Sequence, residues 1–169
     1  MSDSSPDPQA VRSMFARISG RYDCLNHLLS AGIDRSWRRA AVEQAAGGGG
    51  RAAARDLTVL DVCSGTGDLA LAFARAGARV VGVDFAPEML ARALEKRTGA
   101  ARALFAAGDA LALPVASGAF DVAAVAFGLR NLADARAGLA EMARAVRPGG
   151  LVLVLEFSPP RPGLSGGLY

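Results

Sequence analysis

The sequence predicts an α/β fold with a doubly wound, mostly parallel, Rossmann-like sheet. Three observations support this prediction. After residue 56, short apolar runs alternate with segments of helical period, a glycine turn follows the first run, and acids follow the second and third runs. Runs that are apolar along their whole length are typical of parallel strands buried on both faces. Ligands of such sheets bind outside the carboxyl ends of the strands.

Five apolar runs are the expected strands, at residues 57–63, 79–84, 103–107, 120–127 and 151–157. Helices are expected between them at residues 68–76, 86–97 and 134–146. Gly77 closes the first of these helices, Pro87 lies in the first turn of the second, and Asp134 caps the third. The strands and helices therefore alternate throughout this part of the chain, as a parallel sheet requires.

The chain divides by composition into a helical N-terminal part and the α/β domain. We expect a disordered tail at residues 1–10, a helical segment at 11–46, a Gly-rich linker at 47–56, the ligand-binding domain at 57–158 and an irregular tail at 159–169. Asp34 is the expected N-cap of a helix that carries Arg35, Arg38 and Arg39, and these three arginines are interpreted as a solvated face.

Charge and cysteine content exclude several classes of protein. The formal net charge is +3, but Lys96 is the only lysine and no basic run with interleaved aromatics occurs, so a nucleic-acid partner is not expected. Two cysteines form neither a disulfide framework nor a metal-binding spacing, and Cys63 is interpreted as a small apolar filler. With no long apolar run and no signal peptide, we expect a soluble cytoplasmic protein.

The glycine turn lies in residues 59–70, VLDVCSGTGDLA, where Gly65, Thr66 and Gly67 follow the first strand. A strand, a glycine turn and a helix present backbone N–H groups to a nucleotide-like ligand. A dinucleotide is one alternative, because Gly65, Gly67 and Ala70 satisfy the loose dinucleotide fingerprint. Under either interpretation Asp84, at the end of the second strand, can accept both ribose hydroxyls.

Three features favour S-adenosylmethionine as the ligand. Asp61 lies inside the strand, where an acid suits a sulfonium and an α-amino group but not a pyrophosphate, although a structural role for Asp61 stays open. Asp109 follows the third strand and can accept a hydrogen bond from an adenine amino group, with the Ala110 N–H as its complement. The turn at residues 64–70 contains no lysine or arginine to neutralise phosphates.

Two further stretches make the sequence similar to a known family. They are YDCLNHLLSAGIDRSW at residues 22–37 and AFGLRNLAD at 126–134, the latter followed by RAVRPGGLVLVLEFS at 144–158. The chain resembles the class I S-adenosylmethionine-dependent methyltransferases and, more narrowly, the ubiquinone/menaquinone biosynthesis C-methyltransferases. The resemblance covers residues 11–169, and the Phe-Gly-Leu-Arg-Asn run is its most distinctive part.

The resemblance implies methyl transfer to a ring carbon of a polyprenylated quinol, demethylmenaquinol or a methoxy-benzoquinol, with possible peripheral contact with the membrane surface. It implies that Thr66, Asp84, Asp109 and Ala110 bind the cofactor, while Ala126 replaces a serine that usually contributes a further contact. Tyr22, Asp23 and Asn26 of the N-terminal signature are the candidate substrate contacts.

C-methylation needs a phenolate, and Arg130 and Asn131 are the candidate catalytic residues. Arg130 is always charged and carries forked donors, so it can stabilise a phenolate but is a poor general base. A surface arginine that caps the loop is the alternative. His27 is the only histidine, and a surface position is expected for it.

The resemblance also predicts a missing part, because the class I fold normally has seven strands and ends in an antiparallel hairpin. The chain has material for about five strands. Two alternatives to an active methyltransferase therefore stay open: a truncated product that binds the cofactor weakly or not at all, and a nicotinamide-dependent reductase.

Overall fold

The computed structural model describes residues 33–49, 53–98 and 102–156. In these ranges a five-stranded sheet has the order β3-β2-β1-β4-β5, and every neighbouring pair is parallel. The strands are β1 Thr58–Val62, β2 Arg79–Asp84, β3 Ala103–Ala107, β4 Phe120–Ala126 and β5 Val146–Leu155. The predicted Rossmann-like α/β fold is thereby confirmed.

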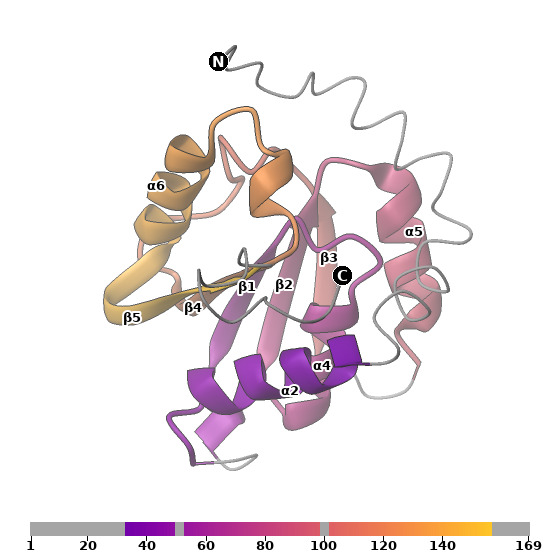
Figure 1. Ribbon diagram of the computed structural model, residues 1–169, viewed down its shortest axis with the longest axis vertical. Helices are drawn as coiled ribbons and strands as arrows, with labels where there is room; N and C mark the ends of the chain where they lie inside the picture. The colour runs from indigo at the N-terminus through magenta and orange to yellow at the C-terminus, as the bar shows by residue number, and fades with distance from the viewer. Residues whose placement is uncertain (1–32, 50–52, 99–101, 157–169) are drawn as a thin grey trace, which may run out of the picture.

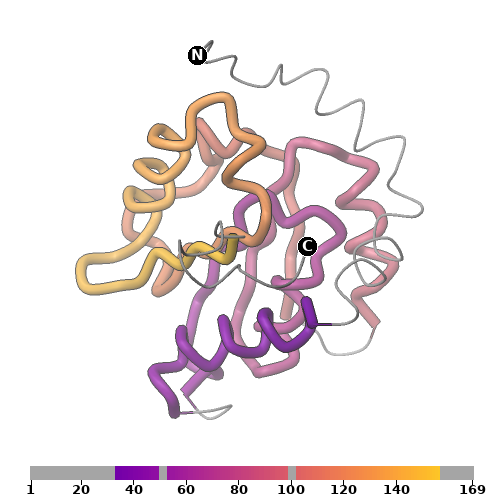
Figure 2. The backbone as a smooth tube through the Cα atoms, viewed as in Figure 1, coloured from indigo at the N-terminus to yellow at the C-terminus, as the bar shows by residue number. Residues whose placement is uncertain are grey.

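Helices cover both faces of the sheet (Figure 1). They are α2 Ile33–Ala45, α4 Asp68–Ala76, α5 Pro87–Lys96 and α6 Ala135–Ala145, with a short 3-10 helix η1 at Leu129–Asn131. One apolar core joins α2 and α4 to the sheet, whereas a second core joins α6 to the opposite face. Helix α5 packs along β2 and β3. Figure 2 shows that the indigo α2 passes close to the yellow β5, although these segments are far apart in sequence.

Strand β5 begins earlier than the sequence predicts. Val146 already pairs with Phe120, and the next paired residue is Leu151, opposite Val122, so the four residues 147–150 stand opposite the single residue Asp121. Gly149 lies in this irregularity with a φ of 79°, a value that favours glycine. The Arg-Pro-Gly-Gly segment therefore ends α6, as expected, but it does so inside a bulged strand.

Helix α2 corrects the interpretation of its arginines. Arg35 and Arg39 are exposed as expected, but the Arg38 side chain is only 11% exposed and pairs with both Asp34 and Asp68. Asp34 lies in the first turn of α2, is buried, and accepts from Arg38 at 2.7 Å. The prediction of a solvated face is therefore wrong for Arg38, because α4 provides a carboxylate that the sequence pattern does not reveal.

The described part of the expected linker packs against the domain. Ala54 is fully buried and joins Ala46 and Ala76 in a small apolar cluster at the far ends of α2 and α4. In the described ranges no helix is both long enough and apolar enough to span a membrane.

Candidate functional site

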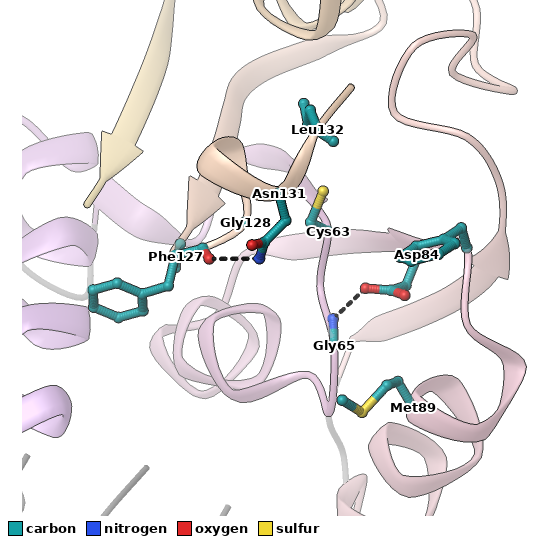
Figure 3. Close-up of a pocket in the computed structure, with 10 residues that line it drawn as sticks. Cys63, Gly65, Asp84, Met89, Phe127, Gly128, Asn131 and Leu132 are labelled. Carbon is teal, nitrogen blue, oxygen red and sulfur yellow. Dashed lines mark hydrogen bonds between the residues drawn. The ribbon is translucent and has the colours of Figure 1, made fainter. Parts of the chain in front are cut away.

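Two adjoining cavities open where the carboxyl ends of β1, β2 and β4 meet. They share Cys63, Asp84, Phe85, Asn131 and Leu132, so we treat them as one trough. The first cavity is completed by Gly65, Met89, Ala126, Phe127 and Gly128, and Figure 3 labels all of these except Ala126. The second is completed by Val83, Gly108, Asp109, Ala110, Leu111 and Ala133. The trough therefore lies at the edge of the sheet where the sequence predicts a ligand.

Asp84 is the central acid of the trough. Its two carboxylate oxygens accept hydrogen bonds from the backbone N–H groups of Gly65, at 2.7 Å, and Ala86, at 2.9 Å. These bonds tie the end of β2 to the glycine turn and to the start of α5. Burial raises the pKa of Asp84, and the backbone hydrogen bonds oppose that rise. A carboxylate offers about four acceptor positions, so the bonds to the backbone leave capacity for a ligand.

Asp61 lies behind the glycine turn and lines neither cavity. It is 1% exposed, and its carboxylate accepts from the Ala70 N–H at 2.9 Å, in the first turns of α4. Burial raises the pKa of Asp61 to about 8, and the nearby Asp84 adds to the rise. This geometry supports the structural alternative for Asp61, an anchor for the turn.

The rest of the glycine turn is held from α5. Thr66 is 3% exposed, and its hydroxyl accepts from the Nζ atom of Lys96 at 3.0 Å. Gly67 has a φ of 81°, and a Cβ atom there would lie 2.8 Å from the Phe105 ring, so the position requires glycine. Thr66 and Gly67 do not line the cavities, whereas Gly65 does. The turn itself contains no basic residue, but the ammonium group of Lys96 reaches it from α5.

Asp109 and Ala110 come together with Asp84 in the second cavity. Asp109 is exposed and accepts from the Leu111 N–H at 2.8 Å. This contact fixes the turn that follows β3 and keeps Ala110 buried beneath it. The structure therefore gathers three of the residues that the sequence assigns to the cofactor.

Phe127 shapes the other end of the trough. It has a φ of 58°, which is uncommon for a residue with a bulky side chain. Its ring points away from the trough (Figure 3) and lies 6.0 Å from the Trp37 ring of α2, between ring centroids. Its carbonyl accepts from the Asn131 side chain at 3.4 Å, and its N–H donates to Leu155 at 2.9 Å. Helix α2 is thus packed directly onto the trough wall.

The two candidate catalytic residues lie in different environments. Asn131 lines both cavities. Arg130 lines neither; its side chain is 51% exposed and donates to Glu156 at 2.8 Å. The structure therefore brings Asn131 together with Asp84 and leaves Arg130 at the rim.

Sequence reasoning missed several apolar residues of the trough wall. They are Phe85, Met89, Phe127 and Leu132, together with Cys63, which was interpreted only as a filler. Burial raises the pKa of the Cys63 thiol to about 12, so it is an inert thiol at neutral pH. The available signal was position: Cys63, Phe85 and Phe127 directly follow a strand, and Met89 lies in the first turn of α5, whereas Leu132 follows η1 and had no such signal.

The lining of the trough limits its ligand. Apolar side chains and two carboxylates face it, and no lysine or arginine is among the lining residues that the structure describes. Phosphates are bound by cations or by oriented N–H groups, whereas a nucleoside with a positive charge suits carboxylates. The described ranges contain no cluster of His, Cys, Asp or Glu able to hold a metal ion. Tyr22, Asp23, Asn26 and His27 lie outside the described residues.

The comparison with protein families gives a match over nearly the whole chain. The ubiE/COQ5 methyltransferase family matches residues 3–165. The chain belongs to this family. Demethylmenaquinone methyltransferase of Deinococcus radiodurans is 45% identical over 99% of the chain and 68% of its own length. Demethylmenaquinone methyltransferase of Thermus thermophilus is 50% identical over 92% of the chain and 70% of its own length.

Solved structures show the same fold in proteins of different chemistry. The YcgJ protein of Bacillus subtilis has a TM-score of 0.63 and 26% identity over 75% of this chain, which spans about half (53%) of that protein. The [4+2]-cyclase SpnF has a TM-score of 0.58 and 28% identity, and the match covers 68% of this chain and 44% of the length of SpnF. Family membership is therefore more informative than the fold, which hosts more than one reaction.

Proposed function

We propose that this chain is an S-adenosylmethionine-dependent C-methyltransferase that methylates a ring carbon of a polyprenylated quinol, with demethylmenaquinol as the substrate. The observation that carries the proposal is the trough, whose carboxylates and missing cations suit a positively charged nucleoside. It occurs in a chain whose relatives in Deinococcus radiodurans and Thermus thermophilus are demethylmenaquinone methyltransferases. The net reaction replaces one ring hydrogen by methyl and releases a proton.

The glycine turn and the acidic wall of the trough beside it fit S-adenosylmethionine, and we name this region the cofactor end: Gly65, Thr66, Gly67, Asp84, Asp109 and Ala110. When bound, the cofactor supplies an electrophilic methyl group on a sulfonium sulfur. Asp84 accepts from the ribose hydroxyls, and Asp109 with the Ala110 N–H binds the adenine edge. Thr66 and Gly67 shape the turn beside the methionine part. Asp61 supports α4 from behind through its hydrogen bond from the Ala70 N–H.

Residues 126–131 form a second region, which we name the acceptor end, and Phe127, Gly128 and Asn131 of this region line the same cavity as Gly65. Asn131 faces the trough and orients the ring hydroxyl. Arg130 supplies positive charge at the rim, where it stabilises the phenolate that activates the ring carbon. Glu156 holds the guanidinium in place through the observed ion pair.

The N-terminal segment 11–46 is the substrate-side part of this proposal. The contact between Trp37 and Phe127 supports it, because it places α2 beside the acceptor end. Tyr22, Asp23 and Asn26, just before α2 in sequence, stay predictions as substrate contacts. Peripheral contact with a membrane surface, which a polyprenylated substrate favours, is likewise a prediction.

Binding calorimetry with the full chain tests the proposal, with S-adenosylmethionine and NADH as separate titrants. We expect binding of S-adenosylmethionine alone. Transfer of a labelled methyl group to a short-chain demethylmenaquinol under reducing conditions then tests the reaction. Binding of NADH instead would support the reductase, and binding of neither would support a product without cofactor affinity.

A further inference from the structure

A chain of charged side chains links α2, α4 and α5 at the back of the glycine turn. Lys96 of α5 donates to the Thr66 hydroxyl and to the Asp68 carboxylate. The other oxygen of Asp68 lies 3.3 Å from the guanidinium of Arg38, which also pairs with Asp34 at 2.7 Å. Asp68 is therefore shared by a cation from each neighbouring helix.

This network is partly shielded from solvent. The described carboxylates and cations that take part in it have side chains exposed by 4% for Asp34, 11% for Arg38, 23% for Asp68 and 28% for Lys96. Exposed pairs on the same helices differ, because Arg92 is 48% exposed and bonds only within α5, to Glu95. Partly buried networks are screened less by salt than such isolated surface pairs.

The network and Asp84 hold the glycine turn from opposite sides. Asp84 binds the Gly65 N–H at the trough, while Lys96 holds Thr66 behind it. Asp68 is the first residue of α4, where a negative charge also favours the helix N-terminus. Helix α2 is connected to both ends of the trough, through Arg38 to this network and through Trp37 to Phe127.

We propose that Lys96 and Asp68 are positioning residues that fix the glycine turn and couple the docking of α2 to cofactor affinity. The coupling to affinity rests on the proposed function, whereas the coupling between α2 and the turn rests on the geometry alone. Because Arg38 and Lys96 share one carboxylate, loss of either cation lets Asp68 move toward the other, and Thr66 moves with it.

Affinity for S-adenosylmethionine is the first measurement, on Lys96→Met, Arg38→Met and the double variant of the full chain. We expect each single variant to weaken binding about tenfold. Independent effects would multiply to a loss of about 100-fold, whereas we expect the double variant to weaken binding by about 30-fold or less. The Michaelis constant for the cofactor rises, whereas kcat at saturating cofactor stays within about twofold. Lys96→Arg restores most of the affinity, because it keeps the charge and the donors.

Arg92→Met is the matched control, since it removes an exposed cation from the same helix. It should leave affinity unchanged. Equal losses of affinity for S-adenosylmethionine in Arg92→Met and Lys96→Met would overturn the proposal. The proposal would also fail if the losses from Arg38→Met and Lys96→Met multiplied in the double variant, because the two residues would then act independently.

Amide hydrogen exchange separates this proposal from the proposed function. We expect Lys96→Met to speed exchange both in the turn at residues 64–70 and in α2 at 33–45, relative to Arg92→Met. If the wild-type chain binds no S-adenosylmethionine, the proposed function fails while this exchange result still supports the coupling. Faster exchange confined to α5 overturns the coupling, even where the cofactor binds.

Discussion

The two ends of the trough are held in different ways. At the cofactor end, buried acids accept from backbone N–H groups: Asp84 holds Gly65 and Ala86, and Asp61 holds Ala70. At the acceptor end, an exposed ion pair holds Arg130, and Phe127 has a backbone conformation that disfavours bulky side chains. The cofactor end is therefore fixed by hydrogen bonds from backbone N–H groups to buried carboxylates, whereas the acceptor end is held by an ion pair, a ring contact and a constrained backbone.

The largest effect is expected from breaking the cofactor end with Asp84→Ala. The change removes the acceptor of two backbone N–H groups and the proposed acceptor of the ribose hydroxyls. A buried donor left without a partner costs about 1–3 kcal/mol, so we expect affinity for S-adenosylmethionine to fall about 100-fold. Calorimetry measures the affinity, and urea unfolding shows how much of the loss is structural.

Glu88→Ala is the control for this variant, because it removes an exposed carboxylate at the start of α5. It should bind the cofactor as the wild type does. Unchanged affinity in Asp84→Ala would remove Asp84 from the cofactor end.

The pH dependence of stability probes the buried acid behind the turn. The pKa of Asp61 is raised from 3.8 to about 8 by burial, so between these values the folded chain holds a proton that the unfolded chain has lost. The contribution of Asp61 to stability is complete below about pH 4 and is lost as the pH rises to about 8. Asn does not titrate, and its side-chain oxygen can still accept from the Ala70 N–H.

Asp61→Asn should therefore gain stability relative to the wild type as the pH rises. Between pH 6 and pH 8 we expect a relative gain of about 2 kcal/mol in the free energy of unfolding. Urea unfolding at both pH values measures it, and groups common to both proteins cancel in the difference. A difference that stays constant with pH would mean that Asp61 is ionised throughout this range.

Sequence patterns predicted the sheet because its strands contain short apolar runs that are separated by segments of helical period. They located Asp84, Asp109 and Ala110 because strand ends meet at one edge. They did not reveal the partner of Arg38, since only the packing of α2 on α4 provides Asp68. They also missed the early start of β5, where Val146 pairs with Phe120 before the glycines begin.

Arg130→Ala tests the proposed role of the acceptor end in methyl transfer. The guanidinium is exposed at the rim and outside the cofactor contacts, so we expect kcat to fall about tenfold while affinity for S-adenosylmethionine stays near the wild-type value. Methyl-transfer kinetics and calorimetry on the same preparation give both numbers. Glu156→Gln is the matched variant, because it leaves Arg130 in place and removes the negative charge of the carboxylate that pairs with it. Lost cofactor affinity with normal kcat would instead place Arg130 at the cofactor end.

The smallest effect comes from the backbone of Phe127. Phe127→Ala and Phe127→Gly both remove the ring contact with Trp37, so their difference isolates the cost of a φ of 58°. Glycine adopts this conformation freely, whereas alanine does not, and we expect the glycine variant to be more stable by about 1 kcal/mol in urea unfolding. Equal stability would mean that the acceptor end relaxes once the ring is gone. In that case the contact between Phe127 and Trp37, rather than the turn itself, imposes the conformation, and α2 would control the shape of the acceptor end.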